Sequence, residues 1–426
     1  MTQASSPIPR LTGYDHTIAF LREGYPFISR RCEALGSTRF AARLMLRPVI
    51  CARGTSAAHL LYGGRLFTRQ GALPPTVLRL LQDKGSVQQL DGEAHRHRKA
   101  LFMELLLNDD GVAEFLALFR EEWFAALEAW TQRSSISVFD EATLVLTRAI
   151  CRWVGVSLAG RGAERMTADL VAMFDSAGKT SPAVLAALLR RNSAERFVSR
   201  QVEAARVGTR TTPLGRVARY RNLDGSLLTT TEATVEVINL LRPTVAIGQY
   251  IMFVALALHE HPDWKRALHG ADDARYDSFA EEVRRYYPFF PVVGGVAREA
   301  FDWDGHWVKA GAWIMLDLYG TNRDPQLFPE PQRFDPEREL SWKAQGYDFI
   351  PQGAGDIATS HRCPGEQFTL GVMREAARMM VENMEYSVPA QDLSLPLNRI
   401  PTRPRSKMVI ADISRAGAGV SRDTRR

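Results

Sequence analysis

The chain has 426 residues, of which 45% are hydrophobic and 24% charged, and this excludes a peptide-sized, fibrous or disordered protein. Its 54 Lys and Arg residues exceed its 48 Asp and Glu residues by only six and form no dense tract, so we expect no nucleic-acid partner. Four isolated cysteines, no signal-peptide pattern and no stretch of about 18–20 apolar residues predict a cytoplasmic protein without obligate membrane association.

The first third of the chain contains two predicted regions. The pattern predicts one helix over residues 14–36 and short β segments over 38–68, with turns at Gly54 and at the Gly63-Gly64 pair. From about residue 92 to residue 290, apolar residues recur at helical spacing.

A long apolar helix is predicted over about 229–259, within that helical region. Strand-like residues follow from 301 to 320, then an extended, proline-rich stretch over 322–349, and a last helix after Cys363. We therefore predict a mainly α fold with a smaller β part. Because no linker-like segment divides the chain, residues 1–426 are expected to form one large domain.

Cys363 lies in the loop FIPQGAGDIATSHRCPGE, over about 349–366, and Pro364 is predicted to be the first helical residue after it. A thiol at a helix N-terminus is favoured as a thiolate, which can be a nucleophile or a metal ligand. Phosphatase-type chemistry needs an Arg six residues after the Cys, but that residue is Thr369. A single thiolate ligand suits haem iron, whereas the other three cysteines are more simply buried core residues.

Arg242 stands in the middle of the most apolar predicted helix, next to the helix-distorting Pro243. A buried guanidinium needs an anion. One interpretation is that Arg242 pairs with a protein carboxylate such as Glu236 or faces solvent. The other is that the missing anion is a substrate carboxylate in an apolar pocket.

Two further groups of charged residues are candidates for a site. Glu282 and Arg285 share one helix face and can pair, although such pairs are usually exposed surface bridges. His95 and Lys99 also share a helix face, in QQLDGEAHRHRK, and together could bind an anionic group such as a haem propionate. A solvated basic helix start is the alternative. Further candidate donors to the same group are Arg69 and His361.

These motifs, in this order and spacing, resemble those of the cytochromes P450 over about residues 10–412. The cysteine loop resembles the haem-binding loop of that family, Glu282 and Arg285 match its ExxR motif, and Arg338 in QRFDPERE matches the arginine that completes a triad with them. The resemblance implies haem b with the Cys363 thiolate as the axial iron ligand. It also implies that the triad is buried and supports the haem loop.

Within that family the chain is most similar to the bacterial fatty-acid peroxygenases, because Arg242-Pro243 stands where ordinary members carry an acid and an alcohol. The resemblance implies hydroxylation of long-chain fatty acids at the α and/or β carbon with hydrogen peroxide and no redox partner. Arg242 would bind the substrate carboxylate, which would serve as the acid–base group. Gln88 would lie above the haem and favour hydroxylation over decarboxylation. The residues implied to line the acyl channel are Phe289, Phe290 and Phe174.

The chain departs from its relatives at two places. Position 82 is Gln where some members carry Phe, and Val296 stands where many carry an Arg to a propionate, for which Arg298 is a possible substitute. Four other functions stay open. They are a decarboxylase that forms terminal alkenes, a monooxygenase that needs a redox partner, a non-catalytic haem-binding protein, and a haem-free enzyme with a cysteine nucleophile.

Overall fold

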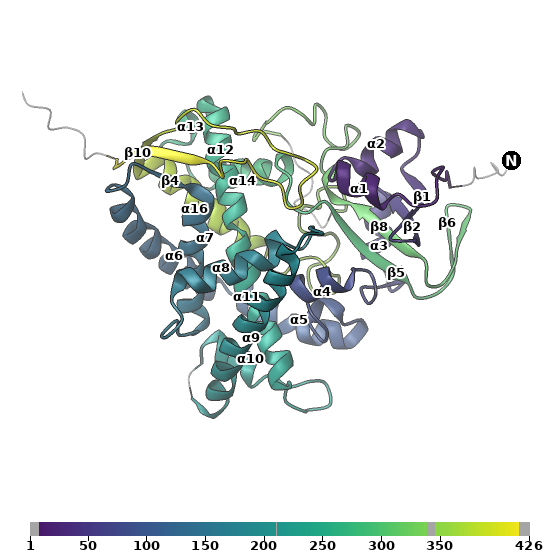
Figure 1. The fold of residues 1–426 in the computed structure, drawn as a ribbon, viewed down its shortest axis with the longest axis horizontal. Helices are drawn as coiled ribbons and strands as arrows, with labels where there is room; N and C mark the ends of the chain where they lie inside the picture. Colours follow the sequence, from purple (N-terminus) through teal and green to yellow (C-terminus); the bar gives the residue numbers. More distant parts are fainter. Residues whose placement is uncertain (1–7, 210, 339–345, 417–426) are drawn as a thin grey trace, which may run out of the picture.

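A computed structural model describes residues 8–209, 211–338 and 346–416. Helices contain far more of the residues than strands do, and the larger β-sheet lies at one end of the molecule (Figure 1). The helices of the main helical part are α4 (Pro75–Leu81), α5 (Gly92–Leu106), α6 (Asp109–Trp130), α7 (Val138–Val154), α8 (Ala163–Asp175), α9 (Ala183–Val207), α10 (Pro213–Ala218), α11 (Thr230–Ala246), α12 (Gly248–Glu260), α13 (Pro262–Leu268), α14 (Asp273–Tyr286) and α16 (Glu366–Glu382), with the short 3-10 helix η1 (Val87–Gln89) before α5.

The larger sheet has five strands in the order β1-β2-β8-β5-β3, with β2 and β8 parallel. At the same end of the molecule lie three helices, α1 (Thr17–Glu23), α2 (Phe27–Ala34) and α3 (Thr55–Tyr62) (Figure 1). The strands are β1 (Arg39–Leu44), β2 (Arg47–Ala52), β3 (Phe67–Thr68), β5 (Val292–Ala297) and β8 (Trp313–Asp317), which α15 (Leu318–Thr321) follows. The hairpin of β6 (Phe301–Trp303) and β7 (His306–Val308) is separate, and a second sheet at the opposite end contains β4 (Ser135–Ser137), β10 (Val409–Arg415) and β9 (Met384–Ser387).

The mainly α fold with a smaller β part is confirmed, but two local predictions were wrong. The helix predicted over 14–36 is broken into α1 and α2 at Gly24, whose φ is +65°. A side chain there is excluded because its Cβ would lie 2.1 Å from the Leu397 carbonyl oxygen. The β segments predicted over 38–68 contain α3, because the residues after Gly54 bury one helical face against the sheet.

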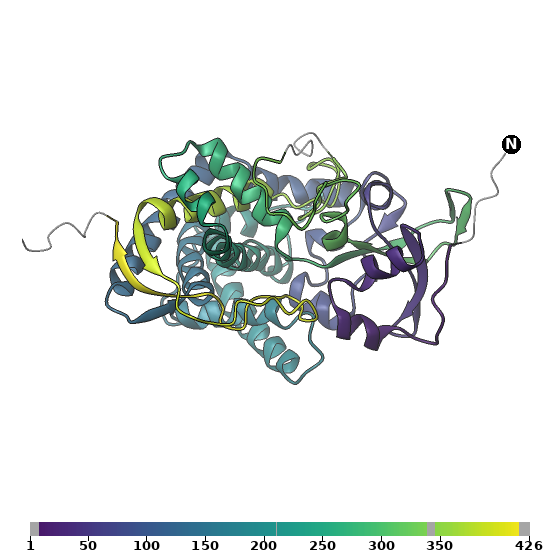
Figure 2. The ribbon, with the colours of Figure 1, turned by 90° about the horizontal axis from the view of Figure 1, so that it is seen from above.

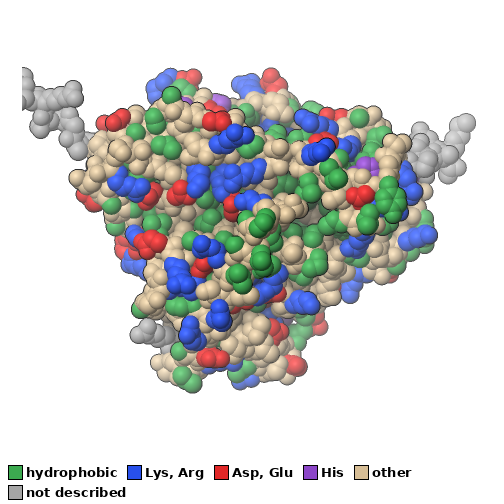
Figure 3. Space-filling view, in the orientation of Figure 1, with side chains coloured by type: hydrophobic (Ala, Val, Ile, Leu, Met, Phe, Trp, Pro, Cys, Tyr) green, Lys and Arg blue, Asp and Glu red, His purple; other side chains and the backbone are tan. Residues whose placement is uncertain are grey.

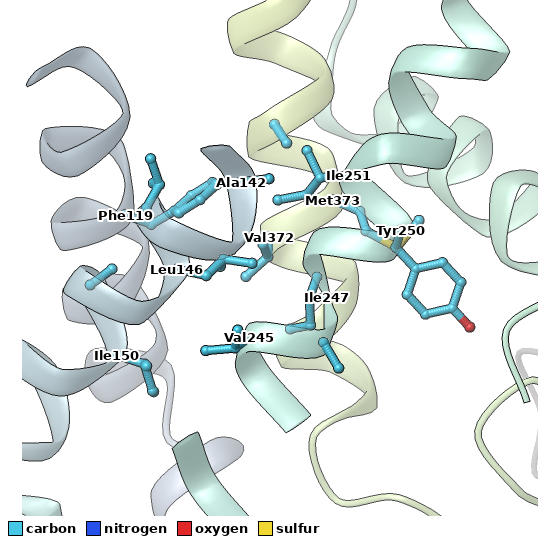
Figure 4. Packing of buried hydrophobic residues seen from close by; sticks show 14 of the residues in the cluster. Phe119, Ala142, Leu146, Ile150, Val245, Ile247, Tyr250, Ile251, Val372 and Met373 are labelled. Carbon is cyan, nitrogen blue, oxygen red and sulfur yellow. The ribbon is translucent and has the colours of Figure 1, made fainter. Parts of the chain in front are cut away.

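The long apolar helix is present as two consecutive helices, α11 and α12, which meet at Ile247. Thr229 and Glu232 form a capping box that fixes the start of α11. Figure 2 shows this pair nearly end-on at the centre of the helical part. At the joint, Gly248 approaches α7 so closely that a Cβ would lie 2.6 Å from the Thr143 methyl carbon. Core side chains from α6, α7, α11, α12 and α16 meet around this joint (Figure 4).

The helical stretch Thr230–Glu260 is long and apolar enough, by length and composition alone, to cross a membrane. The sequence analysis had not recognised such a stretch. In the structure, 94% of the most apolar window is buried inside the protein, as in the core helix of a globular fold. On the face shown in Figure 3, positive and negative side chains are interspersed, so the net charge of +6 is not concentrated there.

Asp317 joins three elements at the end of the larger sheet. Its fully buried carboxylate accepts hydrogen bonds from the Gly320 amide in α15, at 2.7 Å, and from the Ser29 hydroxyl in α2, at 2.5 Å. Burial raises the pKa of this carboxyl to about 6, although both hydrogen bonds act in the opposite direction.

The raised pKa of Asp317 predicts a pH-dependent cost of folding. The folded carboxyl holds its proton more tightly than the unfolded one, so the stability it contributes at low pH is lost as the pH rises through about 6. Asp317→Asn should remove this loss and become the more stable protein at pH 7, by about 2–3 kcal/mol. Thermal unfolding followed by circular dichroism between pH 4.5 and 7.5 measures the difference, with the exposed Glu203→Gln as the control. Parallel pH profiles for Asp317→Asn and the unmodified protein would contradict the prediction.

Candidate active site

The Cys363 loop is tightly bound to its own surroundings. The Cys363 amide donates to the Gln352 carbonyl oxygen at 3.0 Å, and the Gln352 side-chain amide lies 3.7 Å from the sulfur as a donor. At Gly353, where φ is +102°, a Cβ would lie 3.0 Å from the Tyr62 hydroxyl. The contact from Gln352 was missed from sequence, because nothing in the pattern marks a glutamine as a partner of the sulfur.

The helix after the loop begins later than predicted. Helix α16 starts at Glu366, so Pro364 is not its first helical residue. Burial raises the pKa of the Cys363 thiol, and the Gly365 amide and the charges of Lys99 and Arg284 act against that rise. The start of the helix is therefore only one of several opposing effects on the thiolate.

The other three cysteines are buried in the core. Burial raises the pKa of the Cys32 and Cys151 thiols to about 12 and raises that of Cys51 as well, so they are unreactive thiols.

Three of the predicted binding residues, Arg69, His95 and His361, line one cleft beside the cysteine loop, and the fourth, Lys99, binds the loop itself. The His95 and His361 rings lie 4.0 Å apart, and both are neutral because burial lowers their pKa values to about 4 and about 2. Arg69 is buried and donates to the Gly294 carbonyl, while its Nη2 atom has no hydrogen-bond partner among the described residues. Lys99 donates to the Arg362 carbonyl, at 2.7 Å, and to that of Ser360.

Lys99 thus holds the cysteine loop directly, a contact that the sequence did not predict. Three more arginines line the cleft: Arg65, Arg96 and Arg298. Arg298 was considered from sequence, whereas Arg65 and Arg96 were not singled out, although Arg96 directly follows His95 in the same basic segment. Val296 pairs with Trp313 in the sheet.

Glu282 and Arg285 form a fully buried pair, so the exposed-bridge interpretation is wrong. Two guanidinium nitrogens of Arg285 each lie 2.7 Å from a carboxylate oxygen of Glu282. Arg285 also donates to the Pro331 carbonyl, and the Asp335 amide donates to Glu282 at 2.8 Å. Arg338 lies 3.9 Å from Glu282. The structure therefore brings the three motif residues together and attaches α14 to the extended segment near residues 331–335.

A second buried ion network lies beside the first and was missed from sequence. Arg284 pairs with Glu281, at 2.6 Å, and with Glu366 at the start of α16. Glu366 also pairs with Arg362 in the cysteine loop, at 2.6 Å. The sequence did contain one sign of this network, because Glu281 and Arg284 form a second i,i+3 pair, one residue before Glu282 and Arg285. Its partner 82 residues away could not be predicted from spacing alone.

Arg242 is buried in α11, and among the described residues no carboxylate pairs with it. It donates to the Leu80 carbonyl at 3.1 Å and to the Asn239 side-chain oxygen at 3.3 Å. Glu236, the partner considered from sequence, instead pairs with Arg98 at 2.9 Å. Pro243 is the one exposed residue between 233 and 258, so α11 borders open space at the turn that carries Arg242.

Gln88 is connected to Arg242 through one residue. The Asn239 side-chain amide donates to the Gln88 side-chain oxygen at 3.2 Å, while the oxygen of Asn239 accepts from Arg242. Gln82 accepts a hydrogen bond from Gln89 at 2.6 Å, so its side chain is held at the end of α4.

The three predicted aromatic residues lie in different environments. The Phe289 ring stacks on Tyr250 at 4.3 Å and faces inward, whereas Phe290 is 45% exposed. The exposure of Phe290 weakens the prediction that it lines an enclosed channel. Phe174 is buried in α8 against Phe139.

Comparison with known proteins identifies the family. The cytochrome P450 family model matches residues 276–410. Cytochrome P450SP alpha (CYP152B1), solved as a single-residue mutant, is 40% identical, with a TM-score of 0.91, and the match covers 95% of this chain and all of that one. The chain belongs to the cytochrome P450 family.

Two other solved cytochromes P450 are similar over nearly the whole chain. P450EX alpha (CYP152N1), solved with myristic acid, is 37% identical, with a TM-score of 0.91 over 96% of this chain and all of that one. A variant of OleT, solved with arachidonic acid, is 31% identical, with a TM-score of 0.92 over 98% of this chain and 99% of that one. These matches confirm the family and the fold predicted from sequence, and with them an oxidoreductase.

The residues of this cytochrome P450 fit a haem group. Cys363, in the glycine-bearing loop before α16, is the residue that would ligate the haem iron. The unpartnered Nη2 atom of the buried Arg69 lies in the cationic cleft beside the cysteine loop, where an acidic haem substituent would meet it. A haem with a cysteine thiolate ligand is the cofactor of this fold.

Loss of the Glu282 charge is predicted to destabilise this cytochrome P450. Glu282→Gln leaves the buried Arg285 without its anion, which should lower the free energy of unfolding by about 3–5 kcal/mol. Denaturant unfolding of the purified protein measures the loss, and the Soret spectrum of the reduced carbon monoxide complex reports whether the cysteine loop still ligates iron. The matched control, Glu330→Gln, removes an exposed pair with Arg333 and should change little. Equal effects of the two variants would contradict the prediction.

Proposed function

We propose that this cytochrome P450 is a peroxygenase that hydroxylates long-chain fatty acids at the α and/or β carbon with hydrogen peroxide. The observation that carries the proposal is the state of the buried arginines. Among the described residues seven arginines are buried, and five of them pair with carboxylates. The two without a carboxylate are Arg69 and Arg242.

Arg242 is a built anion site. Burial, together with the charge of Arg191, lowers the pKa of its guanidinium to about 9, so it remains a cation at neutral pH. A buried, unpaired cation is costly, and a carboxylate that arrives with the substrate relieves that cost. The neighbouring residues Leu240 and Leu241 are buried and apolar, so the charge of Arg242 lies in apolar surroundings. Fatty acids are the ligands of the similar P450EX alpha and OleT structures.

The cofactor in this proposal is haem b. Cys363 would ligate the iron, and Arg69, His95, Lys99 and His361 would surround the propionates directly or through the loop that they hold. When bound, a cysteine-ligated haem would supply the chemistry by which one oxygen atom of hydrogen peroxide enters a C–H bond while the other leaves as water. The Gln352 amide donates toward the sulfur and moderates its negative charge.

The turn of α11 that carries Arg242, residues 239–245, contains no carboxylate. Arg242 and Pro243 occupy the place where ordinary cytochromes P450 carry an acid and an alcohol, and the Thr244 hydroxyl donates to the Leu240 carbonyl of its own helix. The carboxylate bound by Arg242 would therefore move the proton during cleavage of the peroxide. Substrate binding and acid–base chemistry would depend on the same residue.

The choice of product would depend on Gln88. An amide side chain, held by Asn239, neither gains nor loses a proton near neutral pH, and the resemblance associates Gln here with hydroxylation. The alternative product is a terminal alkene from decarboxylation. We also propose that residues 1–426 form one domain, that no redox partner is needed, and that the protein acts in the cytoplasm.

Turnover without electron donors is the first test. The holoenzyme mixed with tetradecanoic acid and hydrogen peroxide, with no reductase and no NADH, should form mainly 2-hydroxy and 3-hydroxy acids, which mass spectrometry identifies. A requirement for NADH with redox proteins would favour the monooxygenase alternative. No product under either condition would favour a haem-binding protein without catalysis, and a colourless protein without a Soret band would favour the haem-free alternative.

Removal of the proposed anchor is the second test. Arg242→Ala should lower kcat/KM for tetradecanoic acid at least about 100-fold, as expected when one partner of a buried charge pair is lost. The haem content and the carbon monoxide spectrum should stay unchanged. The control is Arg196→Ala, an exposed arginine on α9. Unchanged turnover by Arg242→Ala would contradict the role of Arg242 as the carboxylate anchor.

A further inference from the structure

Four charged residues form a cluster between α4 and α9, behind Arg242. Arg79 and Asp83 come from α4 and the residues after it, and Arg191 and Glu195 come from α9. Arg191 is fully buried and pairs with Glu195 at 2.8 Å and with Asp83 at 3.5 Å. Arg79 pairs with the same two carboxylates. We name these residues the α4–α9 cluster.

The cluster reaches Arg242 through one backbone atom. The Leu80 carbonyl oxygen lies in the last turn of α4, where a helix leaves its carbonyls without intrahelical partners. It accepts from Arg191 at 3.0 Å and from Arg242 at 3.1 Å. The two guanidinium groups are therefore held against the same oxygen, one from α9 and the other from α11.

The backbone next to this carbonyl is itself held by the cluster. Asp83 has a φ of +80°, a conformation that few residues other than glycine adopt, and its amide donates to the Leu78 carbonyl at 2.8 Å. Both arginines of the cluster bind the Asp83 carboxylate, so they stabilise this strained turn. The position of the Leu80 carbonyl thus depends on the cluster.

The charges of the cluster balance one another and leave Arg242 unmatched. Arg79 and Arg191 offset Asp83 and Glu195, so none of the four acts as a free anion toward Arg242. Without the Arg191 charge, the two carboxylates of Asp83 and Glu195 would face only one cation, Arg79, and the cluster would have a net negative charge. That excess negative charge would compete with an incoming carboxylate for Arg242.

We propose that Arg191 is a positioning residue for substrate binding: it fixes the Leu80 carbonyl that orients Arg242, and it neutralises the two nearby carboxylates so that Arg242 is free to bind the carboxylate of the substrate. This inference rests on the proposed function. It assigns a role in carboxylate recognition to a residue of α9 that does not itself touch the carboxylate.

The test compares an acid with an alcohol of the same chain length. In the holoenzyme, Arg191→Gln should raise the dissociation constant of tetradecanoic acid about tenfold and leave that of 1-tetradecanol unchanged, as measured by calorimetric titration and by the substrate-induced Soret shift. Arg196→Gln, also on α9 but exposed, is the matched control and should change neither constant. In an Arg242→Gln background, Arg191→Gln should have no further effect on the acid, because the carboxylate has lost its anchor.

The other possible outcomes of these titrations also decide whether Arg191 positions Arg242. Equal weakening of acid and alcohol would mean that Arg191 only shapes the pocket, and no change in either would mean that Arg242 is oriented without it; both results overturn the inference. If Arg191→Gln does not fold, Arg79→Gln, at a partly exposed position, leaves the same excess of negative charge and should weaken the acid alone, about threefold. If the unmodified enzyme does not prefer the acid to the alcohol, the proposed function itself fails. A normal preference that is lost in Arg242→Ala but retained in both cluster variants overturns only this inference.

Discussion

The cost of burying a guanidinium governs much of this structure. A buried arginine is tolerated when a carboxylate and backbone carbonyls surround it, and the structure meets this condition with Glu282 for Arg285 and with Glu281 and Glu366 for Arg284. The groups that surround these arginines do more than satisfy charge, because some of them come from elements that are distant in sequence. Through them α14 is attached to the extended segment near residues 331–335 and to the start of α16, which carries the cysteine loop.

The same rule explains why two arginines stand out. Arg69 and Arg242 satisfy part of their donors with carbonyl oxygens but have no carboxylate among the described residues. The first lies in the cleft beside Cys363, and the second lies on α11 where Pro243 borders open space. In the proposed function, anions from outside the chain bind at these two positions, the propionates at one and a fatty acid at the other.

Sequence reasoning worked where the signal was local. Arg242 beside Pro243 breaks two rules of an apolar helix, and Cys363 lies in a glycine-bearing loop before a helix, so both were recognisable without a structure. The helix break at Gly24 could not be recognised from sequence, because its cause is the Leu397 carbonyl more than 370 residues away. Arg191 was missed for a related reason: on a charged helix it reads as a surface residue, and its contact with the Leu80 carbonyl of α4 cannot be predicted from spacing.

The larger sheet has a consequence for how the chain folds. Its strand β2 pairs in parallel with β8, so Val49 lies beside Trp313. Strands that are hundreds of residues apart close a very large loop when they pair, and such contacts form late. During synthesis the hairpin of β1 and β2 cannot pair with β8 until the chain has been made as far as Trp313. Its open edge is exposed during that time and can pair with the wrong strand.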